Sequence, residues 1–248
     1  MQTKTLFSQH YLEHRLPDHP EWGEDPRAVF ATVRALWQHA SEHGEGWNEA
    51  QTEQEFIQPV LEALGWATMV QPQAHHAGRV RRPDYALFSD EAAKLRAMPH
   101  QGEDDAFYQR AAAIAEAKYW GRPLSQQDAA GQERWDAKTN PSHQMVSYLV
   151  GTGAPWGILT NGVIWRLYSR EVSSTASEFY EIDLGRIFEA LPTGGPPAEE
   201  QLDAFRRWWL FFCQASFVPD ARGRTFVGRV HEGSATYARR ISDKLKEL

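Results

Sequence analysis

The chain has 248 residues, of which 42% are hydrophobic and 24% charged, values ordinary for a folded soluble protein. Its single cysteine, Cys213, excludes a disulfide framework and a cysteine zinc site, and we expect it to be a buried thiol. The net charge of -7 weighs against a phosphate-rich partner, but a cluster of metal-binding carboxylates would also contribute to it, so that class stays open.

Location follows from what the apolar segments can do. The longest apolar runs are too short to span a bilayer, and no basic-then-apolar leader follows Met1. We therefore expect a cytoplasmic location and no membrane partner.

The chain begins with an arm and a helix. Residues 1–25 are rich in histidine, proline and charge, and they predict a wrapped N-terminal arm. Pro26 begins a helix with a single apolar stripe, and Gly44 and Gly46 end it. A second helix is predicted over 49–64.

The second helix contains two informative residues. Pro59 lies inside it and predicts a kink or a split, because proline has no backbone N–H. Glu53 lies four residues before Ile57, so we expect it on the apolar face and pointing inward. It could add a carboxylate to a metal site, directly or through water. The alternative is a charge in the first helical turn that interacts with the helix dipole.

The remaining elements alternate between strands and helices. Strands are predicted at 67–71, 80–88, 114–120, 156–160, 163–168 and 179–182, and helices at 141–149, 184–191 and 199–217. Residues 89–112 are polar and alanine-rich and predict a helical insertion. Asn161-Gly162 predicts a two-residue hairpin turn. This order predicts an α/β (α+β) fold with a central mixed sheet of about four to six strands flanked by helices.

Three ionisable residues stand on two neighbouring predicted strands. Asp84 follows a proline on the first strand, and Glu116 and Lys118 share one side of the next. That strand is otherwise apolar, and buried charges are costly unless they are paired or bound to metal. Magnesium is commonly held by one or two carboxylates with water and phosphate oxygens. The pattern therefore predicts a magnesium site with Asp84, Glu116 and the Ala117 carbonyl as ligands.

Such a site suits phosphodiester hydrolysis. The metal would polarise the scissile phosphate and acidify a water, and Lys118 would orient that water and neutralise developing charge. The same three residues occur at this spacing by chance in many chains. The alternative is a surface Glu–Lys pair on an edge strand of an unrelated α/β protein, which solvent-facing Glu116 and Lys118 would establish.

Further polar residues could contact DNA. Gln144 and Tyr148 are four residues apart and so share one helix face, from which glutamine can bond a base edge or phosphate and tyrosine can stack. A routine amphipathic helix explains the same spacing. Arg81 and Arg82 could guide a phosphate backbone toward Asp84, and salt bridges to nearby acids are an equal alternative.

Taken together, these residues resemble the N-terminal PD-(D/E)XK nuclease domain of type IIG/IIL restriction–modification enzymes, which is related to the nuclease domains of type I restriction motor subunits. The resemblance covers about residues 1–217 and is carried by residues 6–16, 53–66, 82–85, 116–118, 140–148 and 157–168. It implies a restriction-endonuclease-like core that cleaves double-stranded DNA with magnesium, or manganese as a substitute, in phage defence. It implies catalytic roles for Asp84, Glu116 and Lys118, and accessory roles for Gln144 and Tyr148.

The resemblance also implies partners. The complete enzymes continue into a helical connector, a methyltransferase that uses S-adenosylmethionine, and a target-recognition domain. We expect residues 218–248 to begin the connector, S-adenosylmethionine not to bind this chain, and cleavage of both strands to involve dimerisation on DNA. The alternative that keeps the fold is a catalytically silent DNA-binding or scaffolding module of a defence complex. Intact Asp84, Glu116 and Lys118 count against that alternative.

Overall fold

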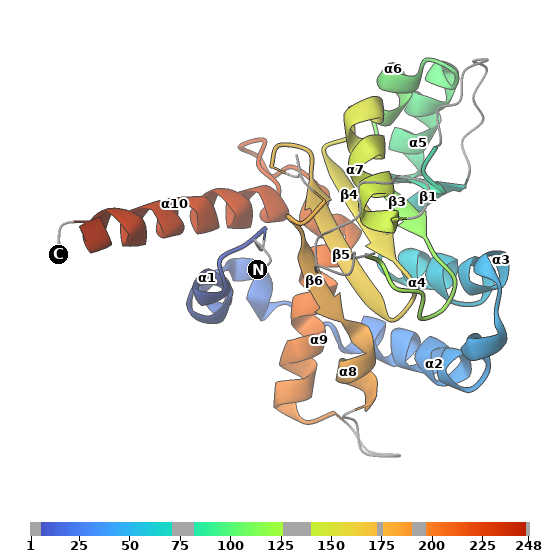
Figure 1. The fold of residues 1–248 in the computed structure, drawn as a ribbon, viewed down its shortest axis with the longest axis horizontal. Helices are drawn as coiled ribbons and strands as arrows, with labels where there is room; N and C mark the ends of the chain where they lie inside the picture. The colour runs from blue at the N-terminus through green and yellow to red at the C-terminus, as the bar shows by residue number, and fades with distance from the viewer. Residues whose placement is uncertain (1–5, 71–81, 126–139, 173–175, 190–196, 247–248) are drawn as a thin grey trace.

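A six-stranded mixed sheet forms the centre of the computed structural model, which describes residues 6–70, 82–125, 140–172, 176–189 and 197–246 (Figure 1). The strands are β1 (Ala67–Val70), β2 (Tyr85–Phe88), β3 (Ala113–Ala117), β4 (Trp156–Thr160), β5 (Ile164–Ser169) and β6 (Tyr180–Asp183). They lie side by side in chain order, with β3 and β4 parallel and the other pairs antiparallel. The α/β fold with a helix-flanked mixed sheet is confirmed.

Helices cover the sheet on both faces (Figure 1). The α-helices are α1 (Gln9–His14), α2 (Arg27–His43), α3 (Glu49–Thr52), α4 (Gln58–Ala63), α5 (Glu91–Ala97), α6 (Asp104–Tyr108), α7 (Pro141–Thr152), α8 (Leu184–Glu189), α9 (Glu199–Phe212) and α10 (Phe226–Lys246). The shorter turns are the 3-10 helices η1 (Leu16–Asp18), η2 (Pro20–Gly23), η3 (Gly44–Gly46), η5 (Met98–His100) and η6 (Gln214–Phe217) and the π-helical η4 (Glu53–Ile57). The predicted insertion at 89–112 is thus helical over α5, η5 and α6.

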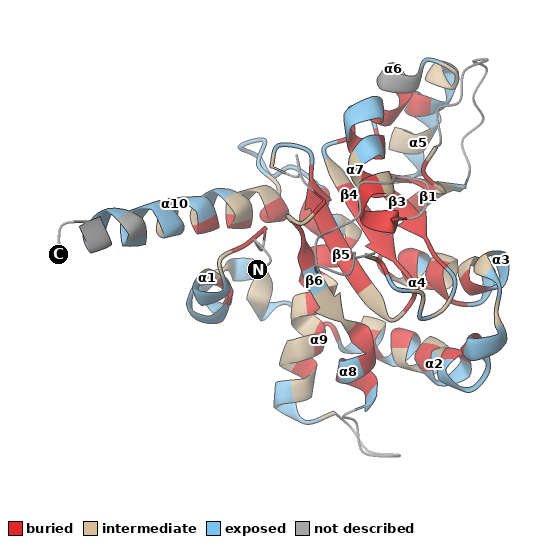
Figure 2. Cartoon of the chain, in the orientation of Figure 1, coloured by how far each residue is buried: buried red, intermediate tan, exposed pale blue. Residues whose placement is uncertain are grey.

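The alternation of side chains along the strands divides the core in two. Tyr85 and Leu87 of β2 join a cluster beneath α2, α4 and α9, whereas Ala86 and Phe88 join a second cluster beneath α5, α6 and α7. Every residue of β2 and β3 is buried (Figure 2). A charged side chain on β3 is therefore buried and shielded from bulk solvent.

The predicted second helix is divided, and Pro59 accounts for the break. A π-helical turn over η4 lies between α3 and α4, and in it the Gln58 N–H bonds to the carbonyl of Glu53, five residues earlier. Proline cannot donate the next bond of a regular α-helix, so the preceding turn widens. Gly65 follows α4 with a φ of 86°, the left-handed conformation with which glycine commonly ends a helix.

Three predicted boundaries are wrong. β2 begins at Tyr85, so Asp84 stands just before the strand, and β3 ends at Ala117, so Lys118 stands just after it. The turn between β4 and β5 contains three residues, 161–163, rather than two. The Asn161 side chain accepts from Val163 N–H (3.0 Å) and Ile164 N–H (2.6 Å), which lengthens the turn.

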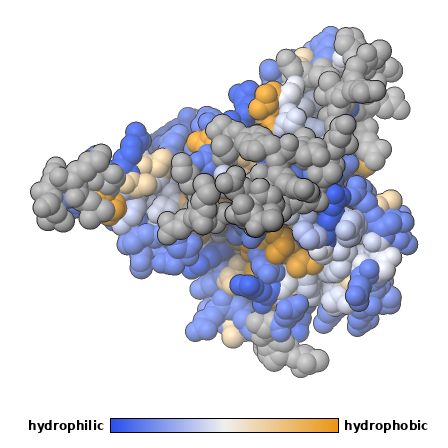
Figure 3. Space-filling view, viewed as in Figure 1, coloured by the Kyte–Doolittle hydropathy of each residue, from blue (hydrophilic) through white to orange (hydrophobic). Residues whose placement is uncertain are grey.

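The arm and the last helices close the other end of the sheet. Leu6 N–H bonds to the Phe179 carbonyl (3.1 Å), and Ser8 N–H bonds to the Ser234 hydroxyl of α10 (2.5 Å). The helix predicted over 199–217 ends at Phe212, and η6 follows. Cys213 is buried, as expected. On the face drawn in Figure 3, apolar side chains form small separate groups among hydrophilic ones.

Within the described ranges, none of the helices combines the length and the apolar character needed to cross a membrane.

Gly162→Ala tests the turn after β4. Gly162 has a φ of 84°, and an added Cβ would lie 2.6 Å from the Trp120 ring, which is itself enclosed by aromatic rings. We expect a loss of unfolding free energy of about 3 kcal/mol, from left-handed strain and overpacking together. Gly121→Ala is the control, since its φ is 70° and its Cβ meets no atom within 4 Å. Equal losses in urea unfolding would contradict the clash.

Candidate active site

Asp84 and Glu116 lie side by side across the β2–β3 ladder. Tyr85 pairs with Ala115, so the register places Asp84, one residue earlier, opposite Glu116, one residue later. The two carboxyl groups interact, since the negative charge of Asp84 contributes to the raised pKa of Glu116. Asp84 Oδ2 also accepts from the Ala117 N–H at 2.9 Å, which fixes its carboxylate against β3. The structure therefore brings together the two carboxylates that the sequence pattern singled out.

Lys118 completes the group with an ion pair. Its Nζ lies 2.6 Å from Glu116 Oε1, and the two residues are 4% and 2% exposed. The Lys118 N–H still bonds to the Thr160 carbonyl at 2.8 Å, which keeps the residue aligned with β4 although β3 has ended. Glu116 and Lys118 thus face the interior and not solvent, and the alternative of a surface pair on an edge strand is wrong.

Burial dominates the electrostatics of both carboxyl groups. Desolvation, with a smaller contribution from the neighbouring Asp84 charge, raises the pKa of Glu116 from 4.5 to about 8, against the opposing effect of Lys118. Desolvation also raises the pKa of Asp84, against the effects of the Ala117 N–H and Lys118. Both carboxyl groups therefore lose their protons less readily than they would in water, and a further positive charge nearby would oppose this shift.

A divalent cation fits this arrangement. Glu116 Oε2 is buried and accepts no hydrogen bond, although its partner oxygen is paired with Lys118. An unpaired buried carboxylate oxygen beside a second carboxylate is costly, and a hard cation with oxygen ligands would relieve it. Asp84 and Glu116 are the two side chains placed to bind one. Over the part of the chain that the structure describes, no three Asp, Glu, His or Cys side chains form a metal-binding group.

Glu53 lies nearby and is held by the sheet. It is half-buried on η4, and the Tyr85 hydroxyl donates to its Oε2 at 2.8 Å. Desolvation raises the pKa of Glu53, and the charges of Asp84 and Glu49 raise it further. The inward placement of Glu53 is confirmed, but it arises from a π-helical turn and not from the regular helix that we expected.

Glu49 is the residue that the sequence reasoning missed. Its two carboxylate oxygens lie 3.8 Å from Lys118 Nζ and 3.8 Å from Arg122 Nη1. It stands four residues before Glu53 at the start of α3, so the face argument applied to Glu53 would have found it. The contact with Arg122 was not readable, because it depends on how the chain turns after β3.

Gln144 and Tyr148 form one unit on α7. Gln144 Nε2 donates to the Tyr148 hydroxyl at 2.7 Å, so the predicted shared helix face is confirmed. Tyr148 is buried in the second core cluster, and α7 packs on β4 and β5. The helix that carries the pair therefore covers β4, which is next to β3, and β5, whereas Asp84 and Glu116 stand at β2 and β3.

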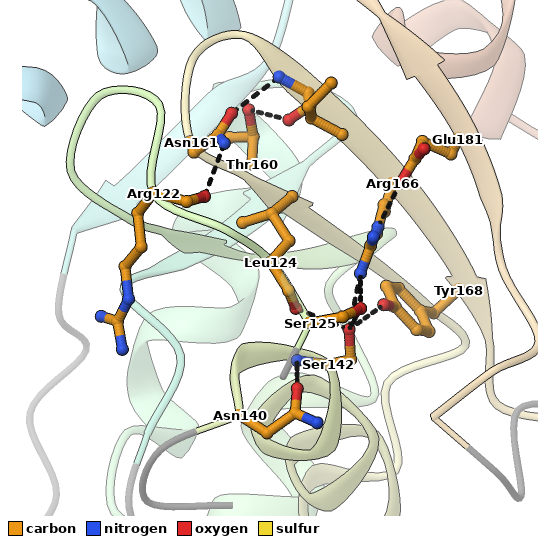
Figure 4. A network of polar contacts seen from close by, with 11 residues as sticks. Arg122, Leu124, Ser125, Asn140, Ser142, Thr160, Asn161, Arg166, Tyr168 and Glu181 are labelled. Carbon is orange, nitrogen blue, oxygen red and sulfur yellow. Dashed lines mark hydrogen bonds and ion pairs between the residues drawn. The ribbon is translucent and has the colours of Figure 1, made fainter. Parts of the chain in front are cut away.

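A buried arginine fixes the beginning of α7 to the sheet (Figure 4). Arg166 of β5 donates through Nη1 to the Ser142 hydroxyl (2.7 Å) and the Ser125 hydroxyl (2.6 Å), and through Nε to Glu181 (2.6 Å). Ser142 in turn donates to the Leu124 carbonyl at 2.8 Å. The segment that follows β3 is thereby joined to the helix that carries Gln144.

The remaining candidates are placed only in part. Arg82 is half-buried two residues before Asp84, where it engages other groups. Arg81 lies outside the described residues. Ala117 contributes its N–H to Asp84, and its carbonyl as a metal ligand stays a prediction.

Comparisons with protein-family models, with curated proteins and with solved structures found no match to this chain.

The buried carboxyls predict a pH-dependent stability in chelator. Because folding raises the pKa of Glu116, the folded state binds more protons than the unfolded state. The contribution of Glu116 to the free energy of unfolding is therefore fully present below about pH 4.5 and is lost as pH rises toward 8. We expect a slope of at most about 1.4 kcal/mol per pH unit, the value for one proton. Urea unfolding across this range measures it. Glu116→Gln should flatten the profile and the exposed Glu91→Gln should not, and parallel profiles would refute the assignment.

Arg166→Leu tests the network at α7. Its loss leaves Ser142 and Glu181 without their charged donor, and we expect a cost of about 2–4 kcal/mol. Arg186→Leu is the matched control, because its pair with Asp183 (3.3 Å) is solvent-exposed and should contribute less than about 0.5 kcal/mol. Urea unfolding of both variants compares their losses of unfolding free energy. Equal losses would show that the buried network contributes no more to stability than the exposed pair.

Proposed function

We propose that this chain is a magnesium-dependent DNA endonuclease domain of the PD-(D/E)XK type, from a restriction–modification enzyme of phage defence. The observation that carries the proposal is the buried pair Asp84–Glu116 with Lys118 at 2.6 Å, next to each other at the ends of two adjacent strands. A binding module has no use for a desolvated carboxylate pair beside a lysine. Hydrolysis of a phosphodiester uses all three.

The proposed roles follow from the contacts. Asp84 and Glu116 would hold the cation, and the Ala117 N–H keeps the Asp84 carboxylate turned toward β3. Magnesium in that position would supply positive charge to the scissile phosphate and lower the pKa of a nearby water. Glu53, held by Tyr85, would bind through water or set the local charge.

Lys118 is proposed to act on the attacking water and on the phosphate. Its ammonium now faces Glu116, so a cation shared by the two carboxylates would leave it able to donate toward an incoming phosphate oxygen. Glu49, at 3.8 Å, would hold the ammonium near that position. Stabilisation of developing negative charge by such a donor is commonly a large part of catalysis.

The wider setting is part of the proposal. The substrate is double-stranded DNA, with Arg81, Arg82 and Gln144 as contacts and dimerisation as the route to cutting both strands. Linked methyltransferase and target-recognition domains, the former using S-adenosylmethionine, would select the sequence. The location is the cytoplasm.

A second candidate is a catalytically silent module that binds DNA or scaffolds a defence complex. It is favoured by the closed Lys118–Glu116 pair and by the want of a third metal-ligating side chain beside Asp84 and Glu116 in the described residues. Loss of cleavage with retained DNA binding would support it.

Plasmid cleavage at matched, high protein concentration with magnesium or manganese tests the proposal. We compare the parent chain with Asp84→Asn and Lys118→Met, which preserve side-chain size, and expect each variant to lose at least about 100-fold in rate. Lys94→Met is the control, because Lys94 forms a surface pair with Glu91 at 3.1 Å that resembles the Lys118 pair without its burial.

The outcomes separate the candidates. Cleavage by the parent and by Lys94→Met alone supports the nuclease. If no protein cleaves, calorimetric titration with manganese decides between them: heat that Asp84→Asn abolishes supports a competent metal site, and no heat from the parent overturns the nuclease proposal in favour of the silent module.

A further inference from the structure

A polar cavity lies between the N-terminal arm and α10, at the end of the sheet away from Asp84 and Glu116. It has a volume of about 600 Å³, and residues of α1, η1 and α10 line it. In Figure 1, α1 and α10 lie beside each other at the β6 end, whereas β1 to β3 are at the opposite end. The cavity is therefore separate from the candidate active site.

Arginines dominate the lining. Four of them face the cavity, at positions Arg15, Arg224, Arg229 and Arg240, against two carboxylates, Asp18 and Glu232. Among the lining residues alone, the arginines exceed the carboxylates by two, whereas the net charge of the whole chain is -7. Such a local reversal of sign is the electrostatic signature of a site for anions.

Two of the arginines are available to a ligand. Arg229 is held by Asp220 at 3.0 Å and by Glu21, and Arg15 pairs with Asp18 at 3.3 Å. Arg224 and Arg240 are exposed, and within the described ranges no carboxylate forms a salt bridge with either. Both guanidinium groups are therefore accessible to a ligand, although the Arg224 charge also acts on Asp220.

The floor of the cavity is built by close packing. An added Cβ on Gly233 would lie 2.7 Å from Tyr11 Cζ, so only glycine lets α10 approach the Tyr11 ring this closely. The Tyr11 hydroxyl bonds to His19 Nε2 at 3.0 Å, and Ser8 N–H bonds to Ser234. These contacts hold the N-terminal arm and α10 together where they line the cavity.

The arginines are arranged in a row rather than around one point. Arg229, Gly233 and Arg240 recur on one side of α10. Arg240 is eleven positions after Arg229, which corresponds to about 16 Å at the helical rise of about 1.5 Å per residue. One phosphate cannot meet both ends of such a row. A nucleic-acid strand, with a phosphate about every 3.4 Å of helix axis, presents several charges over that length.

We infer that this groove binds the phosphodiester backbone of DNA, outside the catalytic centre and without reading sequence. The choice of DNA as the polyanion rests on the proposed function, whereas the affinity for a row of phosphates rests on the groove alone. Arg224 and Arg240 contact the phosphates. Arg229 is held by Asp220 and Glu21 and stabilises the side of the groove.

Fluorescence anisotropy with a labelled DNA duplex in chelator tests the inference, because binding is then measured without cleavage. Arg224→Glu/Arg240→Glu should weaken affinity by about tenfold or more and reduce the slope of log affinity against log salt by about 2, from two lost contacts of about 0.9 each. The control is Arg186→Glu, whose side chain is 86% exposed on α8, and it should bind as the parent does.

Competition with pyrophosphate and with a mononucleotide completes the test. If either displaces the duplex at an equal concentration of phosphate, the groove is a small-anion site and the inference is overturned. No duplex binding by the parent, or an unchanged slope in the double variant, also overturns it. A parent that binds through the arginines but neither cleaves plasmid nor binds manganese supports the groove while the nuclease proposal fails.

Discussion

The ion pair between Lys118 and Glu116 is the interaction around which neighbouring elements are arranged. Its atoms are 2.6 Å apart, and both residues are almost fully buried at the end of β3. Charges this far from water need partners, and the Lys118 ammonium has two more carboxylates near it, Asp84 across the ladder and Glu49 from α3. The β2–β3 register, the position at which β3 ends and the approach of α3 together bring these side chains to one place.

The helical layer meets this strand end through few contacts. Trp120 N–H donates to the Thr52 hydroxyl at 3.0 Å, and the Tyr85 hydroxyl donates to Glu53. The π-helical turn before Pro59 begins at Glu53 and leads into α4. π-Helical turns are frequent at functional sites because they redirect a side chain without ending a helix. Here the turn directs Glu53 toward the carboxylate pair while Phe56 and Ile57 stay in the core.

The distribution of charge explains why net charge was a poor guide to a partner. Carboxylates gather at the β2–β3 end of the sheet, and arginines gather at the junction of the arm with α10. A single total averages these two regions, although fields from exposed charges are screened over about 8–10 Å. An acidic chain can therefore carry a basic surface, and only the location of each charge bears on function.

Sequence alone determined the approximate positions of the strands, the helix-flanked mixed sheet and the placement of Glu116 and Lys118 on one side of their strand, because period-2 alternation and burial cost act within a few residues. It also determined that Gln144 and Tyr148 share a face, which helical geometry fixes locally. Tertiary structure decided the ladder register that puts Asp84 beside Glu116, the approach of Glu49, and the Arg166 network under α7. These contacts join residues distant in the chain, and no local pattern encodes which of many compatible partners packing brings within reach.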